Sequence, residues 1–324
     1  MMLKNLIRAA VLALATVTAV AAHAQDAYPE NRPIRLVVPF PPGGAVDIVG
    51  RLIAPKLSEA LGQNVVVENR GGANGTIGTG IVAKSAPDGH TILLSALGSI
   101  TIIPQVQRVG YDPLKDLTAL TQAVSLTLAW VSKSEGKVRS AQDLIRQAKA
   151  GATLSAGTSG NGSPNHLAIA QFNQLTGSRI AHVPYRGEGP ALTDLLGGQI
   201  DLVVTTVVAA APFIKDGRVV PLATGGSTRA ASLPNVPTLQ EAGISGYEAD
   251  AWQGFFVPAA TPRPIAERLQ RELSKILKSA EVREFLTSRG TDPVGNTSEE
   301  FERKVRSEYD KYGKLIRAID LKLE

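Results

Sequence analysis

Residues 34–61 read IRLVVPFPPGGAVDIVGRLIAPKLSEAL, and this stretch decides the fold. Four of its first five residues are apolar and predict a buried strand, Ile34–Val38. The proline- and glycine-rich segment 39–44 predicts a loop, and the apolar residues at helical spacing after it predict a helix over Asp47–Leu61. A strand, a tight loop and a helix in this order form the repeating unit of α/β folds.

The same alternation continues along the chain. Further strands are predicted at 64–67, 91–94, 126–130, 153–155, 180–183, 201–205 and 219–224, and helices at 140–150, 165–176, 189–197, 209–216, 265–278 and 298–318. Strands that alternate with helices favour right-handed βαβ units and parallel sheets. Two such series, with helices returning at the C-terminal end, predict two α/β lobes with a cleft between them.

The N-terminal 24 residues have the layout of a secretory signal peptide. Lys4 and Arg8 precede an apolar run over 9–22, and the small-x-small pattern Ala22-His23-Ala24 stands before Gln25. The run is shorter than the ~20 apolar residues that a membrane-spanning helix needs. We therefore predict a cleaved signal peptide over 1–24 and a secreted, soluble mature chain.

Composition argues against several classes of function. The formal net charge is +5, and removal of Lys4 and Arg8 with the signal peptide would leave about +3. This dispersed surplus is too small to indicate nucleic-acid binding, and is at most compatible with an anionic ligand. The absence of cysteine excludes disulfides, thiolate metal sites and cysteine nucleophiles.

The first strand-to-helix loop is a candidate anion site. It contains Phe40, Pro42, Gly43, Gly44 and Asp47, at a position where open α/β sheets bind ligands. The two glycines let backbone amides approach a ligand, near the positive end of a helix dipole. We expect Asp47 to cap the helix or to bond loop amides rather than to contact a carboxylate. A tight turn without a ligand remains the alternative.

A second polar loop spans residues 157–166 and reads GTSGNGSPNH. Ser163 is a natural N-cap of the helix that follows. Thr158, Ser159 and Asn161 add neutral donors, and such donors at a helix N-terminus suit a carboxylate. The alternative is a flexible polar loop, but two such loops, one in each half of the chain, favour binding.

Four further positions complete the predicted ligand site. Tyr185 follows a strand and could form a wall of the cleft, while Ser95 and Thr205 lie at the ends of strands that would open toward it. Each of these three is equally compatible with ordinary packing. His166, beside the second loop, is expected to orient a neighbour through a hydrogen bond rather than to act as a base.

Motifs for catalysis are weak. GTGIVA at 78–83 fits G-x-G-x-x-A but does not directly follow a strand, so the dinucleotide-binding context is missing. Ser159 stands in an incomplete G-x-S-x-G motif, because Asn161 occupies the last glycine position. The histidines show no metal-ligand spacing. We predict no enzyme activity, cofactor or metal site, with a hydrolase or transferase using Ser159 and His166 as the alternative.

Short segments in a fixed order carry a family resemblance. They include the loop 39–47, VENR at 67–70, APDG at 86–89, the loop 158–166, PYRG at 184–187, LLGGQID at 195–201 and LPNVPT at 233–238. These segments span nearly the whole mature chain. The chain resembles the substrate-binding proteins of tripartite tricarboxylate transporters, the Bug family of periplasmic binding proteins.

The resemblance implies a Venus-flytrap fold like that of periplasmic binding proteins, with two α/β lobes of mainly parallel sheets joined by a hinge. Lobe 1 would comprise 25–126 plus 249–324, and lobe 2 would comprise 127–248. The resemblance also implies that two loops hold a small carboxylate or related amide through amides, hydroxyls and water. We expect a periplasmic monomer that passes its ligand to membrane transporter subunits. Sensing for a receptor kinase remains open beside transport.

Overall fold

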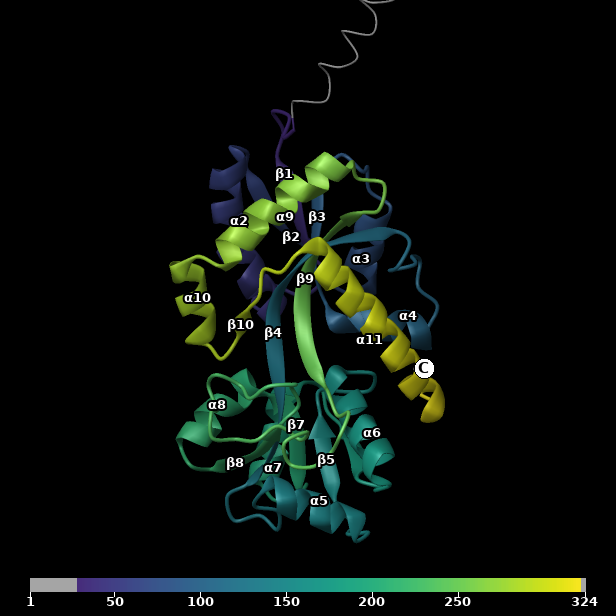
Figure 1. Ribbon diagram of the computed structural model, residues 1–324, viewed down its shortest axis with the longest axis vertical. Helices are drawn as coiled ribbons and strands as arrows, with labels where there is room; N and C mark the ends of the chain where they lie inside the picture. Colours follow the sequence, from purple (N-terminus) through teal and green to yellow (C-terminus); the bar gives the residue numbers. More distant parts are fainter. Residues whose placement is uncertain (1–27, 322–324) are drawn as a thin grey trace, which may run out of the picture.

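The computed structural model describes residues 28–321 and shows two α/β lobes (Figure 1). The predicted signal peptide, 1–24, lies outside these residues. Lobe 1 contains β1 (Ile34–Val38), α2 (Ala45–Leu61), β2 (Val65–Asn69), η1 (Ala73–Gly75), α3 (Thr76–Ala83), β3 (Thr91–Ala96), η2 (Gly98–Ile102), α4 (Ile103–Val106), β9 (Asp250–Pro258), α9 (Arg263–Leu277), α10 (Ala280–Thr287), β10 (Asp292–Pro293) and α11 (Ser298–Ala318).

The second lobe is built from the middle of the chain. Lobe 2 contains α5 (Ala141–Lys149), β5 (Ser155–Thr158), α6 (Pro164–Thr176), β6 (Ala181–Pro184), α7 (Glu188–Leu196), β7 (Leu202–Thr206), α8 (Val207–Lys215) and β8 (Val219–Thr224). The long strand β4 (Leu117–Lys133) runs from lobe 1 into lobe 2 (Figure 1). Over the described part of the chain, no helix combines the length and apolar character needed to cross a membrane.

One connected sheet passes through both lobes. Its strand order is β2-β1-β3-β9-β4-β7-β5-β6, and β8 and β10 also pair with β4. The outer strands of each lobe are parallel, as the βα units predict. The pairings that involve β4 and β9 are antiparallel, because these strands run back along their neighbours instead of following a helical crossover. The expected mainly parallel pairing therefore applies to the outer strands, and the centre of the sheet differs.

The change from one lobe to the other occurs within β4. Residues Leu117–Thr127 pair with β9, whereas Leu128–Ser132 pair with β7. Asp250, at the start of β9, is the partner of Thr127. This change of partner lies beside the predicted lobe boundaries at 126/127 and 248/249, and the boundaries themselves stay a prediction.

Local sequence signals explain where several helices begin and end. Ser163 caps α6 by accepting a hydrogen bond from the His166 amide at 3.2 Å. Thr297 and Glu300 form a capping box at the start of α11. Gly62 ends α2 with a φ of 68°, a left-handed conformation that glycine adopts without strain.

Apolar packing connects the lobes at a second place besides β4. Each lobe has buried apolar clusters of its own. One further cluster contains Leu167 and Ala170 of α6 together with Leu315 and Ile316 of α11. In Figure 1, α11 accordingly descends from lobe 1 toward α6. The lobes therefore meet both along the sheet and between these two helices.

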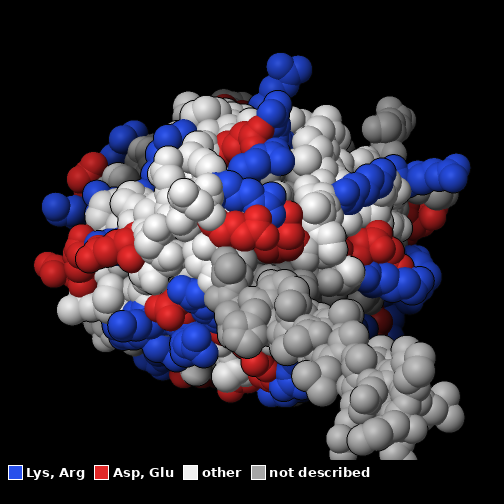
Figure 2. Space-filling view, turned by 90° about the horizontal axis from the view of Figure 1, so that it is seen from above, with Lys and Arg blue, Asp and Glu red and all other residues white. Residues whose placement is uncertain are grey.

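The end of lobe 1 carries charges of both signs in mixed order (Figure 2). In this lobe Arg32 pairs with Asp88 at 2.9 Å, and Arg263 pairs with Glu267 at 2.6 Å. Exposed pairs of this kind contribute little to stability and are screened by salt. This face therefore presents alternating charge rather than a field of one sign.

Candidate ligand-binding site

A cavity of about 240 Å³ lies between the lobes. We call it the inter-lobe cavity. Lobe 1, lobe 2 and the strands that join them all contribute to its wall. Its lining residues are Phe40, Asn74, Ala96, Leu97, Gly98, Ser99, Ile103, Leu126, Ser159, Asn161, Gly162, Ser163, Pro164, Ala251 and Trp252.

Four predicted site residues line the inter-lobe cavity. Phe40 comes from the first predicted loop, and Ser159, Asn161 and Ser163 come from the second. The fold thus brings together two loops that lie more than a hundred residues apart in the sequence. Asn161 is exposed, and its side chain bonds to no other residue in the described part of the chain. Its amide group is therefore free to bind a ligand.

Asp47 organises the first loop from a buried position. Its carboxylate accepts hydrogen bonds from the Gly43 amide at 2.8 Å, from Arg51 Nε at 2.8 Å and from Asn69 Nδ2 at 2.9 Å. Burial alone would raise the pKa of Asp47, but these bonds outweigh burial and lower the pKa below its ordinary value. The structure therefore agrees with the expectation that Asp47 bonds a loop amide.

A buried hydroxyl network lies behind one wall of the cavity. Ser95 Oγ is 2.6 Å from Ser99 Oγ and 3.4 Å from Thr79 Oγ1. Tyr111 Oη donates to the Ser99 carbonyl oxygen at 2.5 Å, and burial raises the pKa of this phenol above its ordinary value. Ser99 belongs to η2, a π-helical turn, which is a feature often found at functional sites. The network fixes Ser99, while the predicted residue Ser95 stands behind it.

Hydrogen bonds also fix the second loop. Ser159 Oγ donates to Asn165 Oδ1 at 3.2 Å. Asn165 is buried, and its Nδ2 donates to the Val204 carbonyl at 2.8 Å and to Glu188 Oε1 at 3.1 Å. Thr206 Oγ1 donates to Glu188 Oε2 at 2.8 Å. Asn165 thus ties the loop to β7 and α7, a role that the sequence pattern did not reveal.

The hydrogen bond that a serine hydrolase would need is not formed by Ser159 and His166. Ser159 bonds to Asn165, and His166 Nδ1 accepts from the Gly162 amide at 3.3 Å. A nucleophile and its base normally lie within hydrogen-bond reach of each other. His166 therefore orients the loop, as expected. Within residues 28–321, no three His, Cys, Asp or Glu side chains form a group that could hold a metal ion.

The other predicted site residues are not among those that line the inter-lobe cavity. Tyr185 Oη donates to Asp194 Oδ2 at 2.8 Å, and burial together with this bond raises the pKa of Tyr185 to about 12. Thr205 is buried, and its hydroxyl has no hydrogen-bond partner among the described residues. The lining leaves out Pro42, Gly43, Gly44, Asp47, Ser95, Thr158, His166, Tyr185 and Thr205. Ligand contact by these residues stays a prediction.

Several lining residues were missed because they come from hinge strands or irregular turns. Leu126 and Ala251 lie where β4 and β9 run together, and Trp252 is fully buried, with Nε1 donating to Glu308 Oε2 at 2.5 Å. Their contribution depends on long-range strand pairing. The lining residues 96–99 do carry a sequence signal, because they follow directly after the predicted strand 91–94.

The cavity combines neutral polar groups with an apolar background. Apolar contacts come from Phe40, Leu97, Ile103, Leu126 and Trp252, and polar groups come from Asn74, Ser99, Ser159, Asn161 and Ser163. Among the described residues, none that lines the cavity is charged. The N-terminus of α6 meets the cavity at Ser163 and Pro164, and a helix N-terminus favours negative charge. This arrangement suits a small molecule with a carboxylate or amide head group.

Curated proteins of other bacteria are similar over nearly the whole chain. A protein encoded in the tcbD-tcbE intergenic region of Pseudomonas sp. strain P51 is 38% identical, over 93% of this chain and 90% of that protein. Protein BugT of Bordetella pertussis is 34% identical, over 96% of both chains. These similarities cover both lobes.

Solved structures support the same relationship. Rpa4515 of R. palustris with adipate superposes with a TM-score of 0.75 at 33% identity, over 90% of this chain and 97% of that one. MatC from Rhodopseudomonas palustris with bound malate gives a TM-score of 0.73 at 30% identity, over 89% and 100%. The model of the tripartite tricarboxylate transporter family receptor matches residues 49–321. The chain therefore belongs to this receptor family, which includes the Bug periplasmic solute-binding proteins.

Proposed function

We propose that the protein captures a small carboxylate, or a related amide, and delivers it to the membrane subunits of a tripartite tricarboxylate-type transporter. The observation that carries this proposal is the inter-lobe cavity, which two loops line with neutral polar groups beside the N-terminus of α6. Two relatives whose structures superpose on this chain hold adipate and malate. A ligand of that class fits the uncharged, donor-rich lining.

Ligand capture would proceed by closure of the two lobes. Phe40, Asn74 and Ser99 belong to lobe 1, whereas Ser159 and Asn161 belong to lobe 2, so a ligand in the cavity bridges the lobes. A ligand shifts a conformational equilibrium only by its differential affinity for the two states. Contacts from both lobes provide this difference, because an open form would offer only one set.

The test is a thermal-shift screen of the chain from Gln25 onward, followed by calorimetry. The protein is first unfolded and refolded to remove any ligand that it carried through purification. The panel contains adipate, malate, aromatic acids, amino acids and nicotinamide-like amides. A ligand at about a hundred times its dissociation constant stabilises the fold by about 2.7 kcal/mol. Absence of any shift across this panel with the stripped protein would count against the proposal.

Asn161→Ala removes one polar group from the cavity without removing a bond inside the protein. We expect the affinity for the best ligand to fall about tenfold, because one hydrogen bond to a charged group is lost. The melting temperature without ligand should stay unchanged. Asn235→Ala is the matched control, since Asn235 is also an exposed asparagine of lobe 2 but lies outside the cavity lining. Equal affinities of the two variants for the ligand would show that Asn161 does not contact it.

Export and delivery are tested in cells. If the signal peptide is cleaved during export, the protein in the periplasmic fraction should have the mass of a chain that begins at Gln25. Transport predicts that a deletion strain loses uptake of the ligand and regains it on complementation. Normal uptake together with loss of a ligand-induced transcriptional response would instead indicate the sensing role. Turnover of esters or amides that disappears in Ser159→Ala would indicate the hydrolase.

A further inference from the structure

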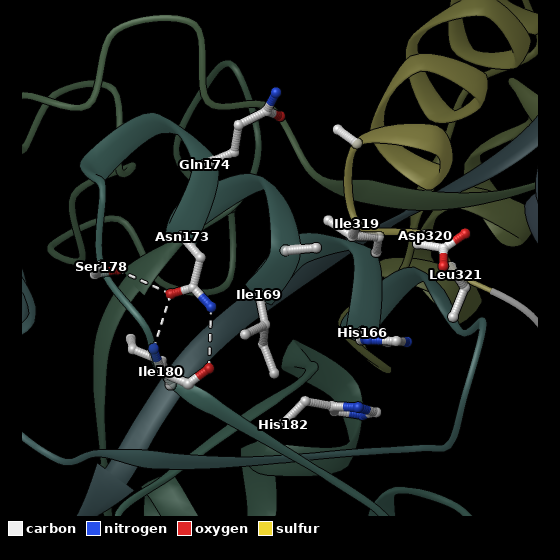
Figure 3. Close-up of a pocket in the computed structure, with 12 residues that line it drawn as sticks. His166, Ile169, Asn173, Gln174, Ser178, Ile180, His182, Ile319, Asp320 and Leu321 are labelled. Carbon is white, nitrogen blue, oxygen red and sulfur yellow. Dashed lines mark hydrogen bonds between the residues drawn. The ribbon is translucent and has the colours of Figure 1, made fainter.

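Two histidines that are isolated in the sequence stack on each other in lobe 2. His166 of α6 and His182 of β6 have ring centroids 3.7 Å apart and an angle of 9° between the ring planes. Figure 3 shows the two rings one above the other in a pocket separate from the inter-lobe cavity. This pocket of about 590 Å³ is lined by α6, by Ser178–His182 and by the C-terminal residues 318–321.

Each ring holds one end of the second loop. His166 Nδ1 accepts a hydrogen bond from the Gly162 amide at 3.3 Å. His182 Nε2 lies 2.7 Å from Thr158 Oγ1, which also accepts from the Gly160 amide at 3.2 Å. The segment between these two anchors contains the cavity residues Ser159 and Asn161. The histidine pair therefore supports the lobe 2 wall of the inter-lobe cavity from behind.

The support at Gly162 depends on the charge of the rings. An imidazole nitrogen accepts a hydrogen bond only when it carries no proton, so a protonated His166 cannot accept from the Gly162 amide. Two stacked imidazolium rings would also repel each other. Burial lowers the pKa of both histidines, and the nearby His166 further lowers the pKa of His182, to about 4. Asp320, from the C-terminal end, is the other ionisable side chain that lines this pocket.

We propose that His166 and His182 are positioning residues of the ligand site, which hold the second loop in its binding shape only while their rings are neutral. Ligand affinity then decreases when the His166 ring gains a proton, whereas the His182 ring can bond to the Thr158 hydroxyl as donor or as acceptor. This inference rests on the proposed function, because it requires that the ligand bind in the inter-lobe cavity. An ionised Asp320 near a ring would favour the protonated form of that ring, and would therefore act in the same direction as a fall in pH.

The test compares affinities for adipate, and in parallel for malate, between about pH 8 and about pH 4, because burial lowers the pKa values of both rings below the ordinary value of about 6.5. The double variant His166→Asn, His182→Gln keeps neutral hydrogen-bonding groups near Nδ1 and Nε2 but does not titrate. As the pH falls, we expect the affinity of the wild type to decrease about tenfold more than the affinity of the double variant. This is the size of effect expected when one hydrogen bond is lost. Protonation of the acid itself changes both affinities equally, because both proteins bind the same ligand, and it therefore cancels from the comparison between the wild type and the double variant.

Controls separate this effect from a general loss of structure. His90→Gln removes a lobe 1 histidine that lies outside both pockets, and should keep the wild-type pH dependence. Asp320→Asn should make the decrease in affinity at low pH smaller, because a nearby carboxylate no longer favours the protonated ring. Equal pH dependence of the wild type and the double variant would overturn the inference.

Nuclear magnetic resonance provides an arm that needs no ligand. The Gly162 amide resonance should shift with the titration of the His166 ring, and should stay constant over the same range in His166→Asn. If neither acid binds the wild type at about pH 8, the proposed function fails for these ligands. The pH dependence of the Gly162 amide resonance still decides whether the rings hold the loop. An amide that does not respond to ring protonation would contradict the inference even if both acids bind.

Discussion

Asp250 is a partly buried residue, with a buried carboxylate oxygen, at the point where β9 begins and β4 changes its partner. One of its oxygens, Oδ1, has no hydrogen-bond partner among the described residues. Burial raises the pKa of Asp250 to about 7, Lys304 acts in the opposite direction, and Glu248 and Glu308 raise it further. Charging this group at neutral pH is therefore costly to the fold.

Asp250→Asn is expected to stabilise the protein at about pH 8 more than at about pH 5. The folded-state pKa lies above the ordinary value of an aspartate, so the stabilising contribution of the protonated carboxyl is lost as pH rises toward about 7. The difference in stabilisation between the two pH values is expected to be on the order of a few kcal/mol at most. Thermal melts at both pH values measure the effect, with Asp310→Asn on the exposed face of α11 as control. A gain of the same size at both pH values would contradict this reading of Asp250.

Individual site residues could be predicted where their chemistry is local. Ser159, Asn161 and Ser163 stand together in one polar loop before a helix, so their shared position in the cavity follows from the sequence pattern. Asn165 and the histidine pair could not be predicted, because their partners come from other elements. Tyr185 bonds to Asp194 and is not among the residues that line the inter-lobe cavity, so its contact with a ligand stays a prediction.

Elements with strong end signals were predicted most closely. Ser140 caps α5 and Ser163 caps α6, as expected, and α11 spans the predicted 298–318. The predicted strand 126–130 is in fact the middle of β4, which extends over Leu117–Lys133. This strand is buried along most of its length, so its sequence lacks the alternation of polar and apolar residues that marks a half-exposed strand. The pairing of β4 with β9 is a long-range contact that a local pattern does not contain.

Packing of α11 on β9 requires glycine at position 254. A Cβ atom added there would lie 2.2 Å from Cζ of Phe301, whose ring is fully buried. We expect Gly254→Ala to lower the free energy of unfolding by about 1–3 kcal/mol, because the core has no room for the extra methyl group. Chemical denaturation measures this loss. Gly189→Ala in α7 is the control, since no atom lies within 4 Å of its added Cβ, and it should be neutral or slightly stabilising. Similar stabilities of the two variants would show that α11 shifts to make room for the methyl group, and would contradict the requirement for glycine at position 254.

At the scale of the whole molecule, the two lobes meet at two places. The sheet joins them through β4, and α6 of lobe 2 packs against α11 of lobe 1. The helix that meets α11 is also the one whose N-terminus reaches the inter-lobe cavity. Movement of one lobe relative to the other would therefore change the α6–α11 contact and the cavity together. This arrangement gives a ligand in the cavity influence over the distance between the lobes.

The most direct test of the central claim is a crystal structure of the chain with the best carboxylate from the binding screen. We expect the carboxylate between the lobes, within hydrogen-bond distance of the second loop at Ser159, Asn161 or Ser163 and in contact with Phe40 of lobe 1. A ligand bound in the pocket of His166 and His182, or on the outer surface of one lobe, would contradict the assignment of the inter-lobe cavity as the binding site.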